Sequence, residues 1–142
     1  MKIDFVTYQI ALKLKEKGFP QVKENTLAMY NENGEWFSLA KTLDKDEYSF
    51  EDFDEKDCVC PTIEQSLKWI RETKKIYIVS AYMPKIMHET GISNDFYYPT
   101  FQKIGLFEPM FFIGGDDDYD TYEKSILAGI EFILDKWENI KI

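Results

Sequence analysis

The sequence predicts an α+β fold with an antiparallel sheet, in a single domain that covers residues 1–142. Three observations predict it. Apolar residues recur at helical spacing near the start, in the middle and at the end of the chain. Strand-like runs separate these segments, and the order of the elements lacks the βαβ alternation that would indicate a parallel sheet. We therefore expect the order α-ββ-α-βββ-α, a hairpin plus a three-strand meander packed by helices. The length and an apolar content of 44% suffice for one hydrophobic core.

The first predicted helix begins near Thr7. Ile10, Ala11 and Leu14 share one of its faces, and Gly18 suits the position just after the last turn. The next segment, "LAMYNENGEWFSLA", places two β-prone runs around an Asn-Gly pair at residues 33–34. This pair tolerates positive φ angles, and it predicts a β-hairpin with a type I′ turn.

A second helix is predicted after an acidic stretch that has no consistent period. Residues 44–57 are expected to form a long loop, and Thr62 followed by Gln65 has the spacing of a capping box. The expected buried stripe of this helix comprises Ile63, Ser66, Leu67 and Ile70.

Three strands and a last helix complete the predicted order. "KIYIVSAYMP", "DFYYPTFQKIG" and "LFEPMFFIGG" have strand character, and Pro99 and Pro109 should lie at an edge, a bulge or a strand start because proline cannot donate to a ladder. The helix is expected over residues 121–139. Its buried stripe is expected to contain Tyr122, Ile126, Ile130, Ile133 and Trp137.

Charge divides the chain into two acidic patches and a nearly balanced remainder. The net charge is −9, and residues 44–57 hold eight acids and two lysines, while residues 116–123 hold five acids and no base. Such patches repel the phosphates of nucleic acid and attract a basic protein surface or a cation. The competing interpretation is that both are solvated loops that aid solubility.

The stretch "GGDDDYDTYEKS" raises the question of a cation site. Asp116, Asp118 and Asp120 match the first three ligand positions of an EF-hand loop, but Thr121 stands where the loop needs glycine and Leu127 where it needs glutamate. We expect no metal here and interpret the stretch as the start of the last helix, where aspartates suit the helix dipole.

No catalytic or cofactor motif is recognisable. Cys58, Cys60 and a lone His88 are too few for zinc, and the cysteines are expected to be buried or idle thiols. The sequence contains no Walker, dinucleotide, nucleophile-elbow or zinc-protease fingerprint, and we expect no cofactor.

Four segments together resemble a known kind of protein: "ALKLKEKGFPQ", "YNENGEWFSLA", "CPTIEQSLKWIRETKKIYI" and "DTYEKSILAGIEFIL". Their order is similar to that of small uncharacterised proteins of gut anaerobic bacteria and their phages and prophages. The chain departs from this pattern in Cys60, where alanine is expected, and in its long acidic stretch. The resemblance implies an accessory protein of a phage or mobile element, and it carries over no activity and no functional residue.

The sequence is compatible with two kinds of function. The first is a cytoplasmic, non-enzymatic protein that acts through protein contacts and binds neither nucleic acid nor membrane, since no apolar run is long enough to span a bilayer. Its possible contact residues are Tyr48, Asp52, Phe53, Asp54 and Glu55. The alternative is a small ligand-binding protein or enzyme with a tyrosine-lined pocket beside the sheet. Its candidate lining residues are Tyr77, Tyr82, Tyr97 and Tyr98.

Overall fold

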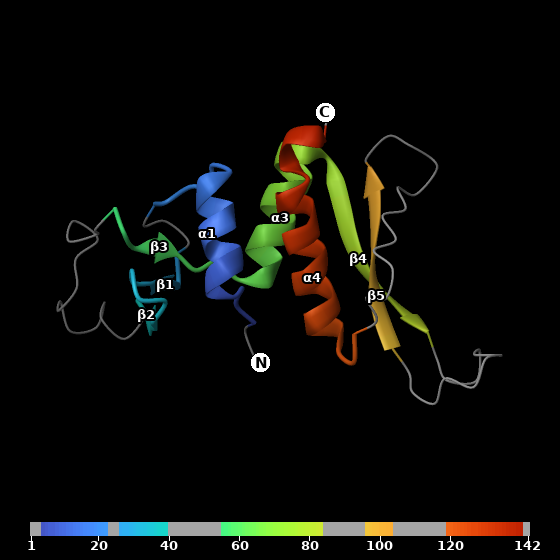
Figure 1. Cartoon of the computed structure of the whole chain (residues 1–142), viewed down its shortest axis with the longest axis horizontal. Coiled ribbons are helices and arrows are strands. Elements are labelled where there is room, and N and C mark those ends of the chain that lie inside the picture. Colours follow the sequence, from blue (N-terminus) through green and yellow to red (C-terminus); the bar gives the residue numbers. More distant parts are fainter. Residues whose placement is uncertain (1–3, 23–25, 40–54, 84–95, 104–118, 141–142) are drawn as a thin grey trace. The chain divides into compact units, whose positions relative to one another are not determined.

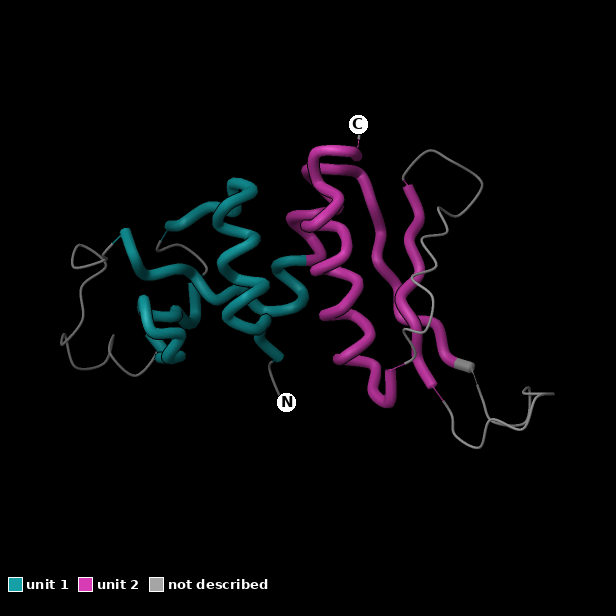
Figure 2. The backbone as a smooth tube through the Cα atoms, viewed as in Figure 1, with its two compact units in different colours: residues 1–66 teal, residues 67–142 magenta. Residues whose placement is uncertain are grey.

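The computed structural model describes residues 4–22, 26–39, 55–83, 96–103 and 119–140. The chain divides into two compact units, residues 1–66 and residues 67–142 (Figure 2). Each unit combines helical segments with antiparallel strands, so the predicted α+β class is confirmed. The expectation of a single domain over residues 1–142 stays a prediction.

The described part of unit 1 contains the helix α1, the first turn of a second helix and a three-stranded antiparallel sheet (Figure 1). The helix α1 spans Tyr8–Glu16, and the strands β1 (Ala28–Tyr30), β2 (Trp36–Ser38) and β3 (Cys58–Val59) lie in the order β2-β1-β3. The predicted apolar stripe of α1 is buried, and Thr7 caps its first turn by accepting a hydrogen bond from a backbone N–H. The first helix of the sequence prediction is therefore confirmed.

The hairpin between β1 and β2 is confirmed, but its predicted type I′ turn is wrong. Among the described residues of this loop only Gly34 has a positive φ, of 80°, whereas a type I′ turn needs two such residues. The Asn31 side-chain oxygen accepts hydrogen bonds from the backbone N–H groups of Asn33 and Glu35, both at 2.9 Å. This side chain closes a three-residue loop, residues 32–34, in which the glycine alone takes the left-handed conformation.

The sequence prediction missed β3. This two-residue strand pairs antiparallel with β1, Tyr30 opposite Cys58, and the N–H of Cys60 donates to the carbonyl of Ala28 at 3.0 Å. A strand this short has no period of its own. Its conformation follows from pairing with a segment almost 30 positions earlier in the sequence.

The helix α3, Ile63–Lys74, begins with the predicted capping box. The N–H of Gln65 donates to the Thr62 hydroxyl at 3.0 Å, and the N–H of Thr62 donates to the Gln65 side-chain oxygen at 2.9 Å. Ile63, Ser66 and Ile70 of the predicted stripe are buried, while Leu67 is half-buried. Two backbone donors at the start of the helix are thereby satisfied reciprocally.

Unit 2 contains residues 67–74 of α3, the helix α4 and a two-stranded sheet on which α4 packs (Figure 1). The strands β4 (Ile76–Met83) and β5 (Phe96–Lys103) pair antiparallel over eight residue pairs. The helix α4 spans Tyr122–Asp135, and the short 3-10 helix η3 follows at Trp137–Asn139. Two strands of the predicted meander are confirmed, and the third, with Pro109, lies outside the described residues.

Close packing of α4 on the sheet is centred on Gly129. A Cβ atom at this position would lie 2.8 Å from the Cγ2 of Ile78 and 3.0 Å from the Cβ of Pro99. Ile126, Ile130, Ile133 and Leu134 of the same helix are buried to 1% exposure or less. Of the predicted stripe, Ile126, Ile130, Ile133 and Trp137 are buried, while Tyr122, in the first turn, is 46% exposed. The regular helix ends at Asp135, earlier than predicted, and Trp137 lies in η3.

Pro99 lies in the middle of β5 without breaking the ladder. Tyr97, two residues earlier, exchanges backbone hydrogen bonds with Tyr119 at 2.7 and 2.8 Å, on the side of β5 that faces away from β4. Since backbone donors alternate sides along a strand, the missing N–H of Pro99 also belongs to that side. This placement satisfies the expectation of an edge position for proline.

Candidate protein-contact surface

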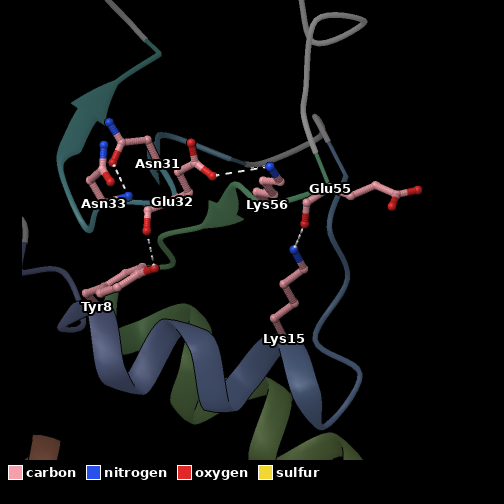
Figure 3. Close-up of polar contacts among 7 residues, drawn as sticks. All are labelled: Tyr8, Lys15, Asn31, Glu32, Asn33, Glu55 and Lys56. Carbon is pink, nitrogen blue, oxygen red and sulfur yellow. Dashed lines mark hydrogen bonds and ion pairs between the residues drawn. The ribbon is translucent and has the colours of Figure 1, made fainter.

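The ammonium of Lys15, on α1, binds the backbone at the end of the acidic residues 44–57. It donates hydrogen bonds to the backbone carbonyls of Glu55 and Asp57, the latter at 2.8 Å. Figure 3 shows that the carboxylate of Glu55 points away from this ammonium, and the residue is exposed. Because Lys15 binds main-chain oxygens, it fixes the backbone here and leaves the Glu55 carboxylate open to solvent.

A second side chain, that of Gln21, hydrogen-bonds to the edge of β3 that faces away from β1. The N–H of Val59 donates to the side-chain oxygen of Gln21 at 2.9 Å, and Lys15 binds the Asp57 carbonyl beside it. Unpaired strand edges are templates for association with other chains. Along this short edge, two side chains take the hydrogen bonds that a neighbouring strand would otherwise make.

The hairpin loop lies beside the same segment. Antiparallel pairing of β1 with β3 brings residues after Tyr30 next to residues before Cys58, and the ammonium of Lys56 lies 3.6 Å from the carboxylate of Glu32. The hydroxyl of Tyr8 donates to the Glu32 carbonyl at 3.2 Å (Figure 3). Both charged side chains are more than half exposed, so this ion pair contributes little to stability.

We call Glu32, Glu55, Lys56 and Asp57 the unit 1 polar surface. Of the contact residues predicted from the sequence, only Glu55 belongs to it. The other four predicted residues, Tyr48, Asp52, Phe53 and Asp54, lie outside the described residues.

Sequence reasoning missed Lys15 and Glu32. The amine and its two carbonyl acceptors are separated by 40 and 42 positions, and no local pattern indicates such a contact. The sequence did contain a signal for the position of Glu32. The Asn-Gly pair at residues 33–34 placed Glu32 at a hairpin loop, although the strand that brings it to Lys56 was not predicted.

The cysteines lie in the interior of unit 1. Both are free, with 0% and 1% exposure for Cys58 and Cys60, which confirms the expectation of buried thiols. The Cys60 thiol donates to the carbonyl of Val6 at 3.6 Å, and the hydroxyl of Tyr30 donates to the same oxygen at 2.7 Å. Burial raises the pKa of Cys58 to about 11 and that of Cys60 to about 12, so neither is an activated nucleophile. His88 lies outside the described residues.

At the start of α4, Asp120 is engaged by a lysine. Its carboxylate lies 2.9 Å from the ammonium of Lys124, whose hydrogen bond lowers the pKa of the carboxyl, and Thr121 caps the helix by accepting from the Lys124 N–H at 3.2 Å. The other two candidate cation ligands, Asp116 and Asp118, lie outside the described residues. Within the described ranges, no group of three or more potential metal ligands comes together.

The four candidate tyrosines do not share one face of the β4–β5 sheet. Side chains alternate along a strand, and Ile78, Pro99 and Phe101 on one face contact α4. By the register, Tyr82 and Tyr97 lie on this helix-facing side, with ring centroids 5.1 Å apart. Tyr77 and Tyr98 lie on the opposite side, so no single pocket beside the sheet is lined by all four.

Comparisons with protein-family models, curated proteins and solved structures gave no significant match to this chain. In the part of the chain that the structure describes, no helix has the length and apolar character needed to cross a membrane.

Proposed function

We propose that the chain is a cytoplasmic, non-enzymatic protein that binds a partner with a basic surface, and that the unit 1 polar surface with the acidic residues 44–57 makes this contact. In this proposal it is an accessory protein of the phage or mobile-element type and does not bind nucleic acid. The contact is electrostatic, so it sets partner choice and the rate of association more than raw affinity.

The placement of Glu55 carries the proposal. Lys15 holds the backbone on both sides of Lys56 and leaves the Glu55 carboxylate in solvent. Glu32 from the hairpin adds a second carboxylate to this surface. A carboxylate on an ordered backbone loses less conformational entropy on binding than one on a free loop, which favours a contact role.

The test is charge reversal with a charge-matched control. The test variant carries Asp52→Lys, Asp54→Lys and Glu55→Lys. The control carries Glu16→Lys, Asp135→Lys and Glu138→Lys, which change the net charge equally at exposed positions near helix ends. Each protein is immobilised and exposed to a bacterial lysate, and the retained proteins are identified by mass spectrometry.

We expect at least one basic protein to be retained by the native chain and by the control, and to be lost with the test variant. Equal retention by the native chain and the test variant would contradict the proposal. Loss with both variants would show that only net charge matters, which would also contradict a contact at residues 52–55.

A further inference from the structure

The outward face of the β4–β5 sheet, on the side away from α4, has the composition of an interface. Among the described side chains, alternation along the paired strands places seven there without a charge among them. These are Tyr77, Val79, Ala81, Phe96, Tyr98, Thr100 and Gln102. A solvated sheet face ordinarily carries polar and charged residues, and 30% of this chain is charged.

Two large apolar residues of this face, both on β4, are exposed to solvent. Val79 is 54% exposed, the highest value among the large hydrophobic residues that the structure describes, and Tyr77 is 45% exposed. The two lie on the same side of β4, two residues apart. Contiguous exposed apolar side chains on a sheet are typical of binding surfaces.

Arg71 borders the face and has unused hydrogen-bonding capacity. Its guanidinium lies 5.5 Å from the centroid of the Tyr77 ring, and within the described residues its side chain makes neither an ion pair nor a hydrogen bond. A guanidinium stacked on an aromatic ring keeps its in-plane donors available for a carboxylate. Tyrosine and arginine are also enriched among the residues that dominate binding energy.

We propose that this outward face, with Arg71 at its border, docks a protein segment that carries apolar side chains and a carboxylate. The apolar side chains cover Val79 and Tyr77, and the carboxylate pairs with the guanidinium of Arg71. This chemistry follows from two observations on the described residues: the face carries no charge, and the guanidinium of Arg71 beside it has no ion-pair partner among them. The site lies on unit 2 and shares no residue with the unit 1 polar surface.

Single-stranded nucleic acid is the competing occupant, because its bases stack on tyrosines and its phosphates bind arginine. The net charge of −9 opposes it. The exposed aliphatic side chain of Val79 also offers no stacking surface, so a protein segment is favoured.

The test is an NMR titration of the full-length, ¹⁵N-labelled chain. The probe is a synthetic peptide of alternating valine, phenylalanine and glutamate, and its control has lysine in place of glutamate. We expect the glutamate peptide to shift the amide signals of β4 and β5. Binding should weaken about tenfold with Arg71→Ala, equivalent to about 1.4 kcal/mol. It should be lost with Val79→Asp.

Two control variants separate this site from general effects. Lys68→Ala removes another exposed cation of α3, and Val22→Asp places the same charge at a valine that is 50% exposed in unit 1. Both should bind like the native chain. Equal binding of the lysine peptide, unchanged affinity after Arg71→Ala, or no shifts at millimolar peptide would overturn the proposal.

Two further results would assign the face to another occupant and would also overturn it. One is binding of an oligothymidine to β4 and β5. The other is a concentration-dependent dimer that Val79→Asp abolishes.

Discussion

Different kinds of internal contact stabilise the two units. In unit 2, α4 lies on the sheet with Gly129 against Ile78 and Pro99, and its interior contacts are almost entirely apolar. In unit 1 the sheet is short, and side chains such as Lys15 and Gln21 complete its edge by bonding to backbone groups. The stability of unit 2 should therefore depend on packing volume, and that of unit 1 on individual polar contacts.

The largest loss of stability is expected from a substitution that creates a cavity in the core of unit 2. Ile130 is 0% exposed, and Ile130→Ala should lower the free energy of unfolding by about 2–5 kcal/mol, from lost burial and an unfilled cavity. Chemical denaturation measures this loss. Hydrogen exchange of peptides from each unit then tests the single-domain prediction, which requires faster exchange in both units. Faster exchange in unit 2 alone would contradict it.

Overpacking the same interface should have the next largest effect. Gly129→Ala gains roughly 1 kcal/mol of helix propensity. It also drives a Cβ to within 2.8 Å of the Cγ2 of Ile78, an atom bonded directly to the Cβ of that side chain and unable to move far. We expect a net destabilisation of about 1–2 kcal/mol by thermal or chemical unfolding. An increase in stability would show that α4 does not approach the sheet so closely.

Removal of the Lys15 ammonium tests whether the stability of unit 1 depends on individual polar contacts. Lys15→Met keeps the apolar stem and removes the donors to the Glu55 and Asp57 carbonyls, so we expect a loss of about 1–2 kcal/mol. Lys13→Met on the same helix is the control. Hydrogen exchange should accelerate at residues 55–59 with Lys15→Met only, and equal exchange in the two variants would argue against the anchor.

The local contacts were predictable from the sequence, and those between distant segments were not. The capping box of Thr62 and Gln65 joins residues three apart, so its pattern is visible in the sequence. The turn at Gly34 was assigned the wrong type because the Asn31 side chain, and not the Asn-Gly pair alone, closes the loop. The bond from Lys15 to Asp57 depends on where β3 lies, which follows from its pairing with β1.

The buried thiols give a smaller, pH-dependent effect on unit 1. Their pKa is 9.0 when unperturbed, and burial raises it to about 11 for Cys58 and about 12 for Cys60. Above pH 9 the unfolded chain therefore releases thiol protons that the folded chain retains, and the free energy of unfolding falls as the pH rises. Urea titrations between pH 8 and 10 should show this decrease. It should be shallower in the Cys58→Ala Cys60→Ala variant, and an equal slope would contradict the burial of the thiols.

In our proposal, the acidic contact surface belongs to unit 1. It is tested most directly by titrating the ¹⁵N-labelled full-length chain with a lysine- and arginine-rich peptide. We predict that the largest amide shifts in the described residues occur at Glu32, Glu55, Lys56 and Asp57, and that they disappear in about 0.5 M salt because screening weakens exposed charge contacts. Shifts concentrated in β4, β5 or α4, or no shifts at low salt, would contradict the proposed contact surface.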